Sequence, residues 1–139
     1  MACPCFYPVE RIGQPGRKSP PGPLGDVWTG ICRARPEGEW LPDAVTAQQL
    51  CNYGYAGQRC ARFPGGPDAV RFSISKDQDG VIGIHFVVEK DHLPLAHGPL
   101  EYSREAARFT LSHSDASVAQ QAQAYISSYL RRKEDHARS

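Results

Sequence analysis

The residues of this sequence most able to do chemistry are its five cysteines, and all five lie within the first 60 of 139 residues. They are Cys3, Cys5, Cys32, Cys51 and Cys60. Cysteines that serve only as small hydrophobic core residues would be spread along the whole chain. The clustering therefore favours a shared role for these thiols over five unrelated ones.

Four cysteine thiolates can hold either a tetrahedral zinc ion or an iron–sulfur cluster. Successive cysteines here are separated by one, 26, 18 and eight residues. Zinc fingers and zinc ribbons hold the metal with cysteine pairs about two to four residues apart, and this sequence has no such pair. An iron–sulfur cluster is larger than a single ion, so its ligands can come from separate loops. Spacing therefore favours a cluster of the 4Fe–4S type, with a structural zinc site as the alternative.

The predicted thiolate ligands are Cys3, Cys32, Cys51 and Cys60. Cys3 is preferred to Cys5 because a proline follows it, as in some cluster-binding runs, and Cys5 is the alternative ligand. A second alternative is a thiol–disulfide redox enzyme that uses Cys3 and Cys5. This alternative is less favoured because redox pairs are usually spaced Cys-x-x-Cys at the start of a helix, whereas here the spacing is Cys-Pro-Cys.

The stretch RCARFP, residues 59–64, carries a local resemblance. It is similar to the closing Cys-x-x-[Phe/Tyr]-Pro element of small bacterial cysteine-cluster proteins that chelate zinc or iron and are often labelled Fe–S oxidoreductases. The resemblance covers about six residues, and that family carries a denser set of cysteines before the element. It implies metal ligation by Cys60 and transfers no activity.

Charge and composition argue against several classes of protein. The formal net charge is only +1, whereas a general nucleic-acid binder has a strong basic excess. No apolar run approaches the roughly 20 residues of a membrane span, and no signal-peptide pattern is present. We therefore expect a cytoplasmic protein, since thiols stay reduced there. No small-molecule substrate is evident, so an electron-transfer or accessory protein with a protein partner is favoured over an enzyme, and no catalytic residue is assigned.

The two halves of the chain differ in composition. Residues 1–67 contain ten of the 12 prolines and ten of the 13 glycines, and 12–26 cannot sustain a helix or an inner strand. Apolar and aromatic side chains at 6–8 and 27–32 nevertheless favour burial. One short helix is predicted after Asp43, which would cap it, with Cys51 in its last turn and Gly54 ending it.

The second half has the periodicities of regular structure. Residues 69–75 and 81–89 alternate between apolar and polar, and turn-forming residues 76–80 separate them, which predicts an antiparallel hairpin. Residues 91–99 are expected to form a loop and 103–111 a short helix capped by Ser103. A long helix is predicted after a cap at Ser114, with one apolar stripe made of Val118, Ala122, Tyr125, Ile126, Tyr129 and Leu130.

These elements predict a single α+β domain over residues 1–139. Its loop-rich lobe, residues 1–67, would contain the cysteines and bind the metal. That lobe would pack on an α+β lobe, residues 68–139, made of an antiparallel β-hairpin or sheet and a C-terminal helix. The predicted function is that of a small iron–sulfur protein whose cluster transfers an electron or stabilises the lobe for binding a partner.

Overall fold

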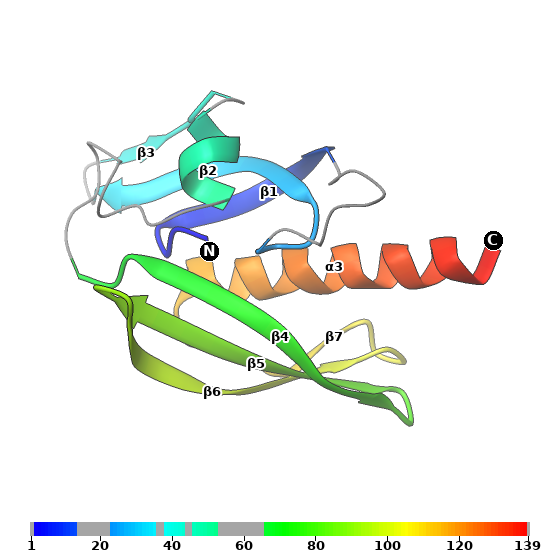
Figure 1. Ribbon diagram of the computed structural model, residues 1–139. Coiled ribbons are helices and arrows are strands. Elements are labelled where there is room, and N and C mark those ends of the chain that lie inside the picture. The colour runs from blue at the N-terminus through cyan, green and yellow to red at the C-terminus, as the bar shows by residue number, and fades with distance from the viewer. Residues whose placement is uncertain (1, 14–22, 36–37, 44–45, 53–65, 139) are drawn as a thin grey trace.

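The computed structural model describes residues 2–13, 23–35, 38–43, 46–52 and 66–138 (Figure 1). Two antiparallel sheets and one long helix form the fold, which confirms the α+β class. The first sheet has the order β1-β2-β3 and consists of β1 (Phe6–Gly13), β2 (Val27–Arg35) and β3 (Gly38–Trp40). The second has the order β4-β5-β6-β7 and consists of β4 (Ala69–Gln78), β5 (Val81–Lys90), β6 (Leu93–Ser103) and β7 (Arg108–Leu111). The helix is α3 (Ala116–Arg138), and a π-helical turn, η1 (Ala47–Asn52), packs beside β2.

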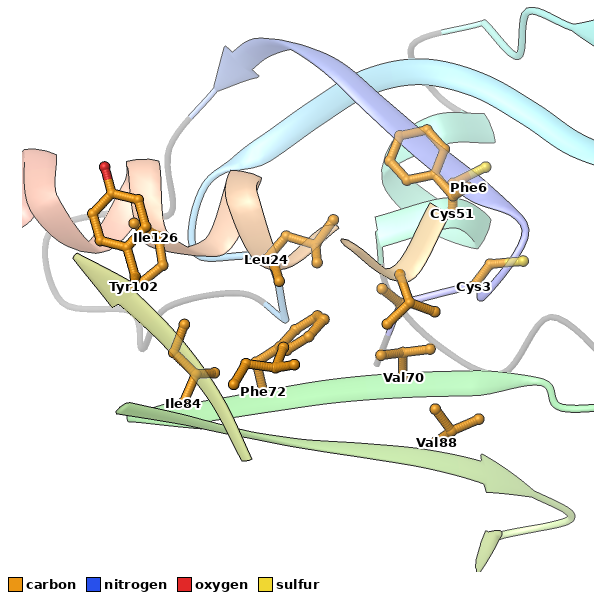
Figure 2. Close-up of a cluster of buried hydrophobic side chains, with 14 of the residues drawn as sticks. Cys3, Phe6, Leu24, Cys51, Val70, Phe72, Ile84, Val88, Tyr102 and Ile126 are labelled. Atoms are coloured by element: carbon orange, nitrogen blue, oxygen red, sulfur yellow. The ribbon is translucent and has the colours of Figure 1, made fainter. Parts of the chain in front are cut away.

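Helix α3 lies between the two sheets, where it contacts β1 on one side and β4 on the other (Figure 1). The core therefore combines residues from both halves of the chain, including Phe6 and Leu24 from the first half and Ile84 and Ile126 from the second. Figure 2 shows these side chains in the layer between the two sheets, with Phe6 on the side of β1 and Ile84 on the second sheet. Burial of apolar surface from both halves stabilises the contact between them.

The hairpin predicted from alternation is confirmed. In β4 and β5, Val70 pairs with Val88, Phe72 with Phe86 and Ile74 with Ile84. Opposite residues of an antiparallel pair share a face, so these apolar side chains form one surface toward α3. The turn between the strands uses Asp79 and Gly80, both at positive φ (56° and 77°), the conformation of the tightest hairpins.

Two expectations for the second half are wrong. Residues 91–99 are not a loop, because Asp91 and His92 form a tight turn at positive φ (52° and 65°) and β6 then pairs with β5. Residues 103–111 are not a helix. The Ser103 hydroxyl accepts a hydrogen bond from the Ala106 N–H at 3.1 Å, and Ala107 has a φ of 54°, so the predicted helix cap instead stabilises a turn that leads into β7.

The terminal helix is confirmed, and its cap lies one residue later than predicted. Asp115 accepts hydrogen bonds from the backbone N–H groups of Ser117 at 2.9 Å and Val118 at 3.0 Å, as an N-cap carboxylate does. The predicted stripe faces the core, with three members buried and three packed against the cluster. No helix in the described part of the chain is long and apolar enough to cross a bilayer.

The described part of the first half contains strands and a helical turn as well as loops. The residues at 6–8 and 27–32 that favoured burial belong to β1 and β2, which pair with Phe6 opposite Cys32. The predicted short helix corresponds to η1, preceded by Asp43, whose carboxylate accepts a hydrogen bond from the Thr46 N–H at 2.7 Å. Cys51 lies in η1 as expected, and the predicted end at Gly54 lies outside the described residues.

Helix α3 packs closely against the chain just before β2. Gly25 has a φ of 81°, and a Cβ atom built on it would clash with the side chain of Ser128. The Ser128 hydroxyl accepts a hydrogen bond from the Asp26 N–H at 3.1 Å. On α3, the Tyr129 hydroxyl donates to the Asp77 carboxylate at 2.6 Å, so the helix is bonded to both sheets.

Candidate functional site

The N-terminal segment that contains Cys3 is held by backbone hydrogen bonds to distant parts of the chain. Ala2 and Val70 exchange two N–H···O bonds of 2.9 and 2.7 Å, which adds a short bridge to the edge of β4. The N–H of Cys3 then donates to the carbonyl of Cys51 at 2.9 Å. Two of the predicted ligands, 48 positions apart in sequence, are therefore neighbours in the fold, and Figure 2 shows both near Phe6.

The other two described cysteines adjoin the same end of β1. The carbonyl of Cys5 accepts a hydrogen bond from the N–H of Arg33 at 2.9 Å, and the next residue, Phe6, pairs with Cys32. The side chains of Cys3, Cys32 and Cys51 are buried, with 7–8 % of their surface exposed, and Cys5 is half-buried. Cys5 is therefore the thiol of this group that is nearest to solvent.

Cys3 and Cys5 interact through their side chains. The thiol of Cys3 donates a hydrogen bond to the sulfur of Cys5, and this bond lowers the pKa of Cys5 despite its partial burial. The same bond, together with desolvation and the nearby sulfur of Cys51, raises the pKa of Cys3. The pair therefore ionises first at Cys5, and the thiolate is the form that binds metals and attacks disulfides.

The predicted ligand set is only partly within the described structure. Cys3 and Cys51 are brought together, Cys32 lies on the adjoining strand, and Cys60 lies outside the described residues. Cys3, Cys5 and Cys32 form no disulfide. Across the residues that the structure describes, no group of three histidine, cysteine or acidic side chains is arranged to hold a metal ion.

Sequence reasoning missed Asn52, which holds η1 against β2. Its side-chain amide accepts from the N–H of Trp28 at 3.0 Å and donates to the carbonyls of Trp28 at 2.8 Å and Ala47 at 2.6 Å. Only 1 % of this residue is exposed, so the amide replaces a missing strand partner for β2. An asparagine directly after a cysteine in a predicted helix gave no signal of this role.

Gln121 of α3 was also missed. Its amide nitrogen donates to the carbonyls of Cys3 at 2.7 Å and Phe6 at 2.8 Å, and the residue is fully buried. The two bonds fix the backbone on both sides of Cys5. The visible signal was a glutamine inside a helical segment of alanines and apolar residues, where a buried polar side chain needs partners.

Comparison with protein-family models, with curated protein sequences and with solved structures gives no significant match. The resemblance of residues 59–64 lies outside the described residues and stays a prediction. The functional assignment therefore depends on the placement and chemistry of the cysteines.

Proposed function

We propose that this protein is a small iron–sulfur protein in which cysteine thiolates hold a cluster of the 4Fe–4S type. The observation that carries the proposal is the gathering of cysteines from three separate segments at one end of β1. Cys3 is bonded through its backbone to Cys51, and Cys5 adjoins the strand that contains Cys32. Unrelated thiols would not need to share one corner of the fold, as the four described cysteines do.

The proposed ligands are Cys3, Cys32, Cys51 and Cys60, with Cys5 as the alternative to Cys3. The hydrogen bond between the two N-terminal thiols lowers the pKa of Cys5, which favours the thiolate form that binds metals. When bound, the cluster would supply one-electron redox chemistry. The chain's own residues would exclude water from it, because the buried Cys3 and Cys51 belong to the apolar core.

We further propose that the protein works in the cytoplasm with a protein partner. Half-buried Cys5 is where the thiol site comes nearest to the surface, so a redox partner would approach there. The role is that of an electron carrier or accessory subunit rather than an enzyme.

Purification without oxygen tests the metal. Iron and sulfide in near-stoichiometric amounts, with broad visible absorbance, support the cluster. A colourless protein that contains one zinc ion refutes the cluster and supports the zinc alternative, a structural module for protein interaction. A metal-free protein in which Cys3 and Cys5 form a reversible disulfide refutes both metals and supports the thiol–disulfide redox alternative.

Single substitutions test the ligand set. Cys32→Ser, Cys51→Ser and Cys60→Ser should each lose the metal, and Cys3→Ser should lose it while Cys5→Ser retains it. The control is Val87→Ala, which removes a buried apolar side chain and tests whether loss of stability alone releases the metal. If Cys5→Ser loses the metal and Cys3→Ser keeps it, the choice between the N-terminal thiols is wrong.

A further inference from the structure

Asp26, directly before β2, is surrounded by arginines from β1 and α3. Its carboxylate is almost wholly buried, with 1 % of the side chain exposed. Arg131 of α3 donates to both carboxylate oxygens, at 3.1 and 2.5 Å. This two-point contact is the strongest form of arginine–carboxylate pair, and it neutralises the charge of Asp26.

Two further guanidinium groups flank the neutralised pair. Arg11 of β1 lies 3.6 Å from one oxygen of Asp26, and Arg132 of α3 lies 3.9 Å from the other. Both distances exceed those of charge-assisted hydrogen bonds, which are about 2.7–2.9 Å. Arg132 also donates to the carbonyl of Gly25 at 3.1 Å, which fixes its position. Once Arg131 is paired with Asp26, the two flanking arginines contribute two positive charges.

The two flanking arginines remain accessible to solvent. Their side chains are 41 % exposed for Arg11 and 26 % exposed for Arg132. They extend from a strand and a helix that pack on each other, and both flank the same carboxylate. Two partly exposed guanidinium groups match the charge and the planar hydrogen-bonding pattern of a phosphate dianion.

We propose that Arg11 and Arg132 bind a phosphate group over the Asp26–Arg131 pair. This site is separate from the cysteines and does not depend on the proposed metal. The ligand is either inorganic phosphate or a phosphomonoester of a small molecule, since both present the same dianionic group. The buried carboxylate of Asp26 holds both arginines beside it through its negative charge.

Isothermal titration with inorganic phosphate, and separately with glycerol phosphate, tests the site, with chloride at matched ionic strength as the reference. Saturable binding of one equivalent of either ligand is expected. Binding of both shows that a phosphomonoester fits, and binding of inorganic phosphate alone shows that the site is closed to larger groups. Absence of saturable binding of either ligand overturns the proposal.

Substitution locates the binding. Arg11→Gln should weaken phosphate binding by at least about tenfold, because one of two charged donors is lost, while the Asp26–Arg131 pair stays intact. Arg108→Gln on β7 makes the same change in net charge at an exposed position away from the site. Equal weakening by both substitutions would show that binding depends on net charge alone, and would overturn the assignment to Arg11 and Arg132.

Discussion

The hydrogen bonds of Asn52 make the most direct link between the fold and the thiol site. Cys51 precedes Asn52 in η1, and the Asn52 amide bonds to both backbone groups of Trp28 and to the carbonyl of Ala47. Asn52→Ala removes all three bonds. It leaves the N–H and carbonyl of Trp28 and the carbonyl of Ala47 without these partners in a mostly buried setting.

The expected loss of stability follows from the count of bonds. At about 1 kcal/mol net per hydrogen bond, with an added cost for polar groups left buried, Asn52→Ala should lower the free energy of unfolding by about 3–4 kcal/mol. For a domain of this size, that corresponds to a fall in Tm of roughly 10 °C. Because native proteins are stable by only about 5–15 kcal/mol, the loss is a large part of the total.

Urea and thermal unfolding followed by circular dichroism measure this effect. The control is Gln120→Ala, which removes one part-buried bond of 3.0 Å to the carbonyl of Pro8 and should cost about 1 kcal/mol. If Asn52→Ala is no more destabilising than Gln120→Ala, the amide does not hold η1 against β2. If the Asn52→Ala variant loses its metal at temperatures where the protein is still folded, the same hydrogen bonds also position Cys51.

Three further predictions concern backbone strain and ionisation. Gly25→Ala should destabilise by more than about 2 kcal/mol, since the new Cβ would clash with the Ser128 side chain on α3 and the position requires positive φ. Gly66→Ala, at a φ of 83° with open space around the new Cβ, should cost only about 1 kcal/mol, and equal losses would contradict a role for the contact between Gly25 and Ser128. In metal-free protein, Cys3→Ala should shift the alkylation of Cys5 to higher pH, because the hydrogen bond that lowers the Cys5 pKa is removed; an unchanged midpoint would show that the two thiols do not interact. Ultraviolet titration of the six tyrosines should show one, Tyr129, whose pKa is raised to about 12 by burial and by its hydrogen bond to the Asp77 carboxylate. Tyr129→Phe should remove this high-pH step, and a step that persists would belong to another tyrosine.

The elements that the sequence predicted are those whose signal is local. The alternation of Val70, Phe72 and Ile74, with a matching alternation after the turn, indicated the β4–β5 hairpin. The stripe from Val118 to Leu130 indicated α3. In both cases the period of the apolar residues equals the period of the backbone, so a short window contains the information.

The errors occurred where pairing decides the conformation. Residues 93–103 contain Pro94, Pro99 and Gly98, which resemble loop residues, yet they form a strand because β5 supplies a partner. Among the residues described, β7 pairs only with residues 101–103 at the end of β6. Pro94 and Pro99 therefore lie where β6 is the edge of the sheet, and a missing N–H group costs little there.

The sequence by itself determined the composition of the candidate site, five thiols in the first 60 residues. It also predicted the hairpin and the helix whose apolar side chains share a core with Cys3 and Cys51. The tertiary structure decided which thiols are neighbours. Cys3 meets Cys51 because Ala2 pairs with Val70. Arg131 reaches Asp26 across 105 positions because α3 packs against the first sheet. Such contacts depend on long-range hydrogen bonds and shared burial, which no local pattern of residue types specifies.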